Sequence, residues 1–434
     1  MSKADNLKDF LTDVADAIRA KKGSTDLINP QDFSSEIASL SGGLEIVDMT
    51  ETTATIEPNK VYVWGMVESL DITLGASTDK SDFFAFRFRC SKPTMTSLTV
   101  NGAIWAEDTE LDAQGKPVLD LGSWYQCEIK GGTSALYARL AHYIPFEDSN
   151  VEAVLLANGV GDGIGVTYKD AAKVTSILSW FNGNADITSF AEFVNFSRIS
   201  NLVQYAFNGC SSLTEITLPA GVTSIGLGAF KDCTTLAEIS LPASLTGIFS
   251  YAFLNCSSLT KVLNLENTKV TGIADAAFRY CSSLAEIALP ASLTSIGNYA
   301  FQNASFVEIT LPSSLTSIAS SFYGCTKLTR VINIENTQLT SIGNNAFNGC
   351  SSLAEIALPA SLTSIGGNAF QYCSSLQYIR IEATTPPTLA STNAIPSTIG
   401  AIYVPDESVA AYQAATNWSS FASKIKGISE MPAK

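Results

Sequence analysis

Apolar positions recur at a nearly fixed interval through the C-terminal half of the chain. From Ile187 to Arg380 the pattern E-I-x-L-P-x-S-L-T-S-I-x-x-x-A-F-x-x-C-S-S-L is repeated, with polar residues varying around constant apolar columns. Successive copies lie 21, 23 or 25 residues apart, as measured between their phenylalanines, Phe207, Phe230, Phe253, Phe278, Phe301, Phe322, Phe347 and Phe370. This period predicts a solenoid in which each copy forms one coil stacked on the previous coil.

A single coil of this kind is not stable by itself. Each large apolar side chain contributes about 1.5–3 kcal/mol when it is buried. Fixing the backbone costs about 1–2 kcal/mol for every residue of the coil. Neighbouring coils must therefore complete the core, and equivalent side chains form rows along the solenoid with a spacing of about 4.8 Å.

A row of cysteines is expected three positions after each phenylalanine. Its members are Cys210, Cys233, Cys256, Cys281, Ala304, Cys325, Cys350 and Cys373. Regular cysteine spacing raises the question of a metal site or disulfides. However, Ala304 interrupts the row, the chain has a single His, and no C-x-x-C pair occurs. Because Cys packs as a small apolar residue for which Ala is a natural substitute, we interpret the row as core.

A second row is expected to point outward. It consists of Glu215, Glu238, Lys261, Glu286, Glu308, Arg330, Glu355 and Tyr378. Stacked like charges repel, and Lys261 and Arg330 interrupt the acidic residues. The row predicts a solvated face, and a divalent cation held between paired Glu side chains is the alternative.

Part of the repeat region is duplicated. Cys281–Gly297 and Cys350–Gly366 are identical and lie 69 positions apart, as do the related segments Asn264–Val270 and Asn333–Leu339. Three coils were therefore copied as a block. The two longer coils are expected to project a bulge from one face.

These repeats resemble the BspA-type leucine-rich repeat family over residues Ala185 to Gly427. The ending I-Y-V-P-D-E-S-V-A-A-Y-Q-A-A-T-N-W from Ile402 also fits that family. The resemblance implies adhesion or recognition through the solenoid surface. It implies no catalytic residues.

Residues 1–43 predict two short amphipathic helices, the first over 2–22 and the second from Asn29-Pro30. Their apolar stripes must be buried against another protein or a second copy, because so short a segment cannot form a stable domain alone. The expected anchor or oligomerisation residues are Leu7, Phe10, Leu11, Val14, Ile18, Phe33 and Ile37. The segment resembles the N-terminal segment of tailed-phage virion proteins, which implies attachment to other virion proteins.

Residues 44–157 alternate apolar and polar positions in short runs broken by Pro, Asn and Gly. F-F-A-F-R-F-R-C from Phe83 is one such run, and six to eight strands of this kind predict a β-sandwich. I-E-P-N-K-V-Y-V-W-G from Ile56, followed by I-T-L-G, resembles a small sandwich module of phage tail and fibre proteins. His142 lies here without a catalytic signature, and we expect it to have a packing or surface role.

Two further segments complete the expected domain order. Residues 158–184 are a linker and an irregular first coil, since N-G-V-G-D-G-I-G lacks the features of a phosphate loop. The solenoid follows over 185–400, and 401–434 form a capping strand and helix in which Val409, Tyr412, Trp418, Phe421 and Ile425 cover the last coil. The expected fold class is therefore multi-domain and mainly β.

Composition narrows the range of partners. The net charge of −15 argues against binding nucleic acid or anionic membranes. No apolar run is long enough to span a membrane, and M-S-K-A-D-N-L-K-D-F lacks the apolar core of a secretory signal. We therefore expect synthesis in a bacterial host cytoplasm, without membrane insertion. The nine cysteines fit a reducing compartment.

No constellation of residues predicts an enzyme, a cofactor or a metal. The expected function is a non-enzymatic phage virion protein, as a tail, fibre or capsid decoration, that adheres to a host-cell receptor or glycan and forms a homo-oligomer. A bacterial surface adhesin of the BspA type and a structural decoration without a ligand are the alternatives. Outward aromatic residues predict the binding surface, because Tyr offers a large contact area at low entropic cost. They are Phe249, Tyr251, Tyr280, Tyr299, Tyr323 and Tyr372.

Overall fold

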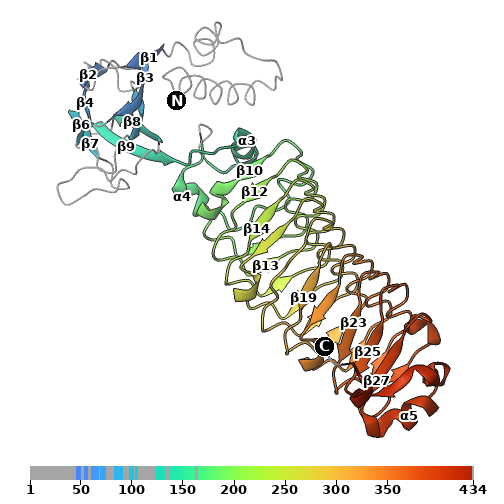
Figure 1. Cartoon of the computed structure of the whole chain (residues 1–434). Coiled ribbons are helices and arrows are strands. Elements are labelled where there is room, and N and C mark those ends of the chain that lie inside the picture. Colours follow the sequence, from blue (N-terminus) through green and yellow to red (C-terminus); the bar gives the residue numbers. More distant parts are fainter. Residues whose placement is uncertain are drawn as a thin grey trace. The chain divides into compact units, whose positions relative to one another are not determined.

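The computed structural model describes residues 45–49, 53–56, 60–67, 69–74, 83–90, 97–101, 103–105, 124–131, 136–161 and 165–432. The chain divides into two compact units, Met1–Lys173 and Val174–Lys434 (Figure 1). The helices expected in residues 1–43, with their anchor residues, lie outside the described residues. The expected domain boundaries at 43, 157, 184 and 400 stay predictions.

The described residues of the first unit form two β-sheets. Strands β1, β3, β5, β8, β9 and β7 form a six-stranded sheet in that order, and β2, β4 and β6 form a three-stranded sheet. The bounds are β1 Glu45–Met49, β2 Thr53–Ile56, β3 Lys60–Val67, β4 Ser69–Leu74, β5 Phe83–Cys90, β6 Ser97–Asn101, β7 Ala103–Trp105, β8 Trp124–Gly131 and β9 Leu136–Tyr143. The runs expected to be strands are strands, and β1 was not singled out from the sequence.

The β-sandwich expected for 44–157 is not confirmed. Along β1 to β6, consecutive strands enter alternate sheets, so β1–β3–β5 and β2–β4–β6 pair in parallel. Among the described strands, only the β5–β8 and β8–β9 pairs are antiparallel. Immunoglobulin-like sandwiches, in contrast, are built from antiparallel sheets. The alternation of polar and apolar residues predicts strands, but it does not determine the direction in which they pair.

Two helices follow these strands, α3 Ser149–Ala157 and α4 Tyr168–Ala171. The sequence analysis did not predict α3, which begins after Asp148, whose carboxylate accepts a 2.9 Å bond from the Asn150 N–H. The ring of His142 stacks on Tyr125 with centroids 4.5 Å apart and lies 4.3 Å from the ring of Tyr168. Of the packing or surface role expected for His142, the ring contacts show packing.

The second unit is a solenoid whose coils share a nine-stranded parallel sheet, here called the inner sheet (Figure 1). Each coil adds one two-residue strand in register with the next, so that Ile225, Ile248 and Ile273 are neighbours in one row. Its strands are β11 Asn201–Leu202, β13 Ser224–Ile225, β15 Gly247–Ile248, β17 Gly272–Ile273, β18 Ser295–Ile296, β20 Ser317–Ile318, β22 Ser341–Ile342, β24 Ser364–Ile365 and β26 Thr388–Leu389.

A second set of strands forms another face of the solenoid, here called the outer face. They are β10 Ser189–Phe190, β12 Glu215–Ile216, β14 Glu238–Ser240, β16 Lys261–Leu263, β19 Glu308–Thr310, β21 Arg330–Ile332, β23 Glu355–Leu358, β25 Tyr378–Ile381, β27 Ala401–Val404 and β28 Ile425–Gly427. Unlike the inner sheet, this face is divided into separate sheets. The pairs are β10–β12, β14–β16 and β19–β21, followed by the four-stranded sheet β23–β25–β27–β28.

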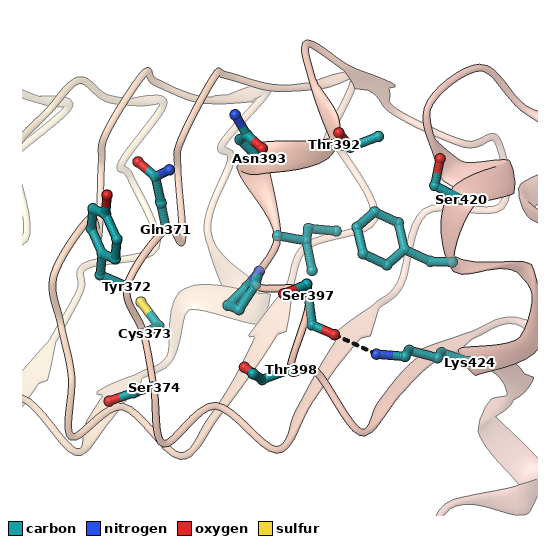
Figure 2. A pocket seen from close by; sticks show the side chains of 13 residues that line it. Gln371, Tyr372, Cys373, Ser374, Thr392, Asn393, Ser397, Thr398, Ser420 and Lys424 are labelled. Carbon is teal, nitrogen blue, oxygen red and sulfur yellow. Dashed lines mark hydrogen bonds between the residues drawn. The ribbon is translucent and has the colours of Figure 1, made fainter.

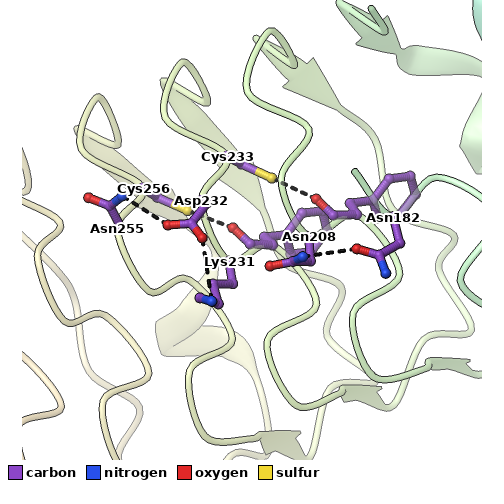
Figure 3. A network of polar contacts seen from close by, with 9 residues as sticks. Asn182, Asn208, Lys231, Asp232, Cys233, Asn255 and Cys256 are labelled. Carbon is purple, nitrogen blue, oxygen red and sulfur yellow. Dashed lines mark hydrogen bonds and ion pairs between the residues drawn. The ribbon is translucent and has the colours of Figure 1, made fainter. Parts of the chain in front are cut away.

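The expected rows of the core are confirmed. The eight phenylalanines are fully buried, and successive rings stack with centroids 5.0–5.7 Å apart and interplanar angles of 3–13°. Each cysteine of the row is buried and free, and its Sγ donates a bond of 3.0–3.2 Å to a phenylalanine carbonyl of the preceding coil. The thiols therefore link the core to the backbone, as Figure 3 shows for Cys233 and Cys256.

The two long coils form the expected bulges as 3₁₀ turns, η2 Leu265–Asn267 and η3 Ile334–Asn336. Each turn begins after an asparagine in the left-handed conformation, Asn264 with φ 66° and Asn333 with φ 67°. The Nδ2 of Asn333 donates a 2.8 Å bond to the carbonyl of Leu311 on the preceding coil. The asparagines therefore set the backbone direction of the bulge.

The C-terminal cap covers the last coil as expected. It comprises η4 Thr392–Ala394, η5 Asp406–Ser408, α5 Val409–Ala414, η6 Trp418–Lys424 and η7 Ile428–Glu430. Tyr412 and Trp418 are fully buried, and each donates a 2.7 Å bond to a carbonyl of the solenoid, those of Ala383 and Pro387. α5 begins after Ser408, and the Asp406 carboxylate accepts bonds from the backbone N–H and the hydroxyl of Ser429.

No helix of the described residues is long and apolar enough to cross a membrane.

Candidate binding surface of the solenoid

Each coil makes a tight turn around its stacked phenylalanine. The residues from two positions before to two positions after each phenylalanine are here called the turn face. Backbone bonds run from coil to coil along it: Asp232 N donates to Leu254 O at 2.8 Å, and Tyr280 N donates to Gln302 O at 2.9 Å. This ladder requires the N–H and C=O groups to point along the axis of the solenoid.

The ladder is obtained with a left-handed backbone on both sides of the phenylalanine. Positive φ angles occur two positions before it, at Tyr205, Gly228, Tyr251, Ala276, Tyr299, Asn345 and Asn368. They also occur two positions after it, at Gly209, Asp232, Asn255, Tyr280, Asn303, Gly324, Gly349 and Tyr372. Most of these residues are Gly, Asn or Asp, the types that tolerate this conformation best.

Four tyrosines expected from the sequence to bind a partner occupy these left-handed positions. Tyr251, Tyr280, Tyr299 and Tyr372 have φ angles of 57–61°. Their exposed fractions are 42%, 37%, 37% and 70%. A left-handed backbone costs an L-residue about 1–2 kcal/mol, which Gly would not incur and Asn would partly avoid. Exposed tyrosines therefore stand where the fold itself favours smaller residues, and strain of this kind is typical of functional positions.

Three of the tyrosines predicted from the sequence, Tyr280, Tyr299 and Tyr323, form a cluster with Arg279, which the sequence analysis did not select. The Arg279 guanidinium carbon lies 4.6 Å from the ring centre of Tyr280 and 5.7 Å from that of Tyr299. Its Nη2 donates a 2.9 Å bond to the Tyr280 hydroxyl. The ring of Tyr323, which is half-buried, meets Tyr299 edge-on with centroids 6.0 Å apart. Cation–π contacts to Tyr280 and Tyr299, and the ring contact between Tyr299 and Tyr323, hold this group as one aromatic patch.

Other parts of the turn face carry polar side chains that bond along the row. Asn255 Nδ2 donates to Asp232 Oδ1 at 2.9 Å, and Lys231 forms an ion pair with the same Asp232 at 3.5 Å (Figure 3). Asn208 Nδ2 donates to Asn182 Oδ1 at 2.9 Å. These polar groups bond to one another, whereas the tyrosines present their rings to solvent.

A cavity of about 550 Å³ lies where the turn face meets the C-terminal cap (Figure 2). Three segments line it: Gln371–Ser374 from the last phenylalanine turn, 392–398 and 420–424 from the cap. Tyr372 belongs to this cavity. Lys424, which the sequence analysis did not select, donates from Nζ to the Ser397 carbonyl at 2.6 Å. A cavity assembled from residues 371 to 424 has no signal in any one stretch of sequence.

The outer face carries the expected row of charges. Glu308 and Arg330 form an exposed ion pair at 3.3 Å, and the Tyr378 hydroxyl donates to a carboxylate oxygen of Glu355. Burial, followed by this bond and the nearby carboxylate charge, raises the pKa of Tyr378 to about 12. Among the described residues no group of three or more His, Cys, Asp or Glu side chains is placed to hold a metal ion.

The cysteine row is not a reactive site. Burial raises the pKa of the Cys325 and Cys373 thiols to about 12. It also raises the pKa of the Cys281 thiol well above its ordinary value. Because thiolates are the reactive form, these cysteines are poor nucleophiles and poor metal ligands at neutral pH.

The remaining predicted residue, Phe249, is 53% exposed but follows β15 and lies outside the turn face. The structure therefore groups Tyr280, Tyr299 and Tyr323, and places Tyr372 beside the cap cavity.

Comparison with known proteins agrees with this geometry. The family model for the BspA type leucine rich repeat region matches in six copies, over residues 181–272, 200–329 and 271–390. No curated protein matches the chain. The resemblance of residues 1–157 to phage virion proteins is not supported by these comparisons and stays a prediction.

Several solved structures are similar to the chain. The T. pallidum leucine rich repeat protein TpLRR is 28% identical over 41% of this chain and 72% of its own, with a TM-score of 0.33. The pneumococcal vaccine antigen PcpA is 20% identical over 54% and 78%, with a TM-score of 0.27. A leucine rich cell surface protein from Faecalibacterium prausnitzii A2-165 is 19% identical over 56% and 83%, with a TM-score of 0.24.

Proposed function

We propose that the chain is a non-enzymatic adhesion protein, because the family model for the BspA type leucine rich repeat region matches residues 181–390. Its solenoid recognises a protein or glycan on a cell surface. The observation that carries this proposal is the set of exposed tyrosines at left-handed positions of the turn face. Their rings offer contact area at positions where stability alone favours Gly or Asn.

The aromatic patch is the proposed centre of recognition. Arg279, Tyr280, Tyr299 and Tyr323 combine flat apolar rings with hydroxyl groups and one cation. Aromatic and arginine side chains are the residue types that dominate binding energy at protein surfaces. The acidic outer face of the same coils is a solvated surface in this proposal.

The proposed carrier is the virion of a tailed phage. This part of the proposal rests on the resemblance of residues 1–43 to the N-terminal segment of virion proteins. Those residues would attach the chain to other virion proteins or to further copies of itself. If particles assemble with an equal content of the chain after residues 1–43 are deleted, the attachment role is wrong.

A bacterial surface adhesin is the second candidate, and the BspA-type repeats favour it, since proteins with these repeats are typically surface proteins. In both cases the turn face does the binding. A purely structural decoration would need no such face.

Binding to whole cells tests the adhesion proposal. The full chain would be labelled and applied to a panel of bacterial strains, beside a variant with Asn at Tyr251, Tyr280, Tyr299 and Tyr372. Asn occupies the same positions in sister coils, at Asn345 and Asn368 before the phenylalanine and at Asn255 and Asn303 after it, so the variant should fold. A control with Glu238→Gln and Glu286→Gln changes the outer face only. We expect the tyrosine variant to lose binding and the control to keep it; equal binding by both contradicts the proposal.

A further inference from the structure

We propose that the cavity at the C-terminal cap, lined by Tyr372 and Lys424, binds an acidic sugar unit, meaning a saccharide residue that carries a carboxylate. This inference deepens the proposed adhesion function and rests on it for its biological context. The cavity has its own geometry and can be tested separately.

The size and lining of the cavity fit a small polar ligand. Its volume of about 550 Å³ lies within the range of protein ligand sites. Its side-chain hydroxyls and amides belong to Gln371, Ser374, Thr392, Asn393, Ser397, Thr398 and Ser420. Gln371 Oε1 accepts a 3.4 Å bond from Asn348, which leaves the amide N–H groups of Gln371 to serve as donors. Such uncharged donors and acceptors match the hydroxyl groups of a sugar.

Tyr372 supplies a flat aromatic surface beside these groups. It is 70% exposed, and its backbone φ is 60°. At the equivalent position, other coils have Gly209, Asp232 or Asn303. Sugar rings present C–H groups on one face, and these pack against aromatic rings. The strain and exposure of Tyr372 are explained if a ligand covers the ring.

Lys424 fixes the charge of the ligand. Figure 2 shows it across the cavity from Tyr372, with its ammonium group bonded to the Ser397 carbonyl at 2.6 Å. An ammonium group has three donors, so two remain for a carboxylate. Lys424 is the one charged residue of the lining, which contains no Asp or Glu. This local positive charge favours an anionic group on the ligand.

Titration calorimetry with two matched disaccharides tests the inference. One ends in glucuronic acid and the other has glucose in its place. We expect the full chain to bind the acidic disaccharide about tenfold more tightly at low salt, because a charge-assisted bond is added. Lys424→Gln should remove the preference and leave the neutral affinity unchanged. Tyr372→Asn should weaken both affinities by about tenfold, because the ring contact is lost.

Tyr205→Asn is the matched control, since it makes the same change at another left-handed position, outside the lining of the cavity and outside the four tyrosines proposed to bind cells. Its affinities should equal those of the unmodified chain. The inference is overturned if neither disaccharide binds, if both bind equally, or if the two tyrosine variants behave alike. If the chain adheres to cells through its tyrosines but binds neither disaccharide, only the proposal for the cavity is overturned. Disaccharide binding without cell adhesion would overturn the proposed function alone.

Discussion

The thiol of Cys373 donates a 3.1 Å hydrogen bond to the carbonyl oxygen of Phe347, one coil earlier in the solenoid. The same contact recurs along the cysteine row, so each coil that carries one of these cysteines is joined to its neighbour by a buried group that must stay protonated. A structural row of this kind makes stability dependent on pH.

We predict that the free energy of unfolding falls as the pH rises from about 9 to about 12. The pKa of the buried Cys325 and Cys373 thiols is raised from 9.0 to about 12, so the unfolded chain releases these protons first. Their contribution is complete below pH 9 and is lost as the pH approaches 12. Denaturant titration across this range measures the slope. Cys373→Ala should flatten it, as Ala304 shows that the site accepts Ala; an unchanged slope would contradict the thiol origin.

Tyr372→Asn should raise the free energy of unfolding by about 0.5–1 kcal/mol, because Asn adopts the left-handed backbone at lower cost. Thermal denaturation of the full chain measures the shift. The reverse change, Asn303→Tyr, is made at the equivalent position of another coil and should lower the stability. A loss of stability in Tyr372→Asn would show that the ring, and not the backbone, determines stability at this position.

Phe278→Ala should lower the free energy of unfolding by about 3–5 kcal/mol, since it removes a fully buried ring. The ring stacks on Phe253 at 5.0 Å and on Phe301 at 5.6 Å, so both neighbours lose a contact. Phe278→Leu, which keeps most of the volume, should cost clearly less. Equilibrium denaturation compares the two variants, and equal losses would argue against stacking as the main contribution.

Asn333→Ala should destabilise the long coil by about 1–2 kcal/mol. It removes the 2.8 Å bond to the Leu311 carbonyl and places Ala at a φ of 67°. Asn333→Gly removes the same side-chain hydrogen bonds, including the 2.9 Å bond from Asn336 Nδ2, but tolerates the left-handed backbone and should cost less than Asn333→Ala. Hydrogen exchange of the Ile334–Asn336 turn reports the local opening. If the two variants are equal, the backbone conformation is not what Asn333 supplies.

The rows of the solenoid could be predicted because each depends on one repeated position. Burial of the phenylalanines and cysteines, and exposure of Tyr372, follow from the period alone. The aromatic patch and the cap cavity could not be predicted, because Arg279 and Lys424 acquire their neighbours only through stacking and capping. In the first unit, alternation located the strands but not their parallel pairing.

The segment E-I-A-L occurs twice in the solenoid and has a different secondary structure each time, which the sequence alone does not predict. At Glu355–Leu358 it is strand β23, paired in register with β25. At Glu286–Leu289, within an identical stretch of 17 residues, it forms no described strand and pairs with neither β16 nor β19.

Neighbouring coils account for the difference. The segment lies between β16, which pairs with β14, and β19, which pairs with β21. The bulge that follows β16 diverts the long coil, and β21 of the second long coil likewise does not pair with β23.

The sequence by itself therefore determined the coil, its rows and its buried side chains, since these follow from local periodicity. The tertiary structure decided which backbones meet and which surface side chains gather. Hydrogen bonds between coils depend on the length and path of the neighbour, which a segment does not encode in its own residues.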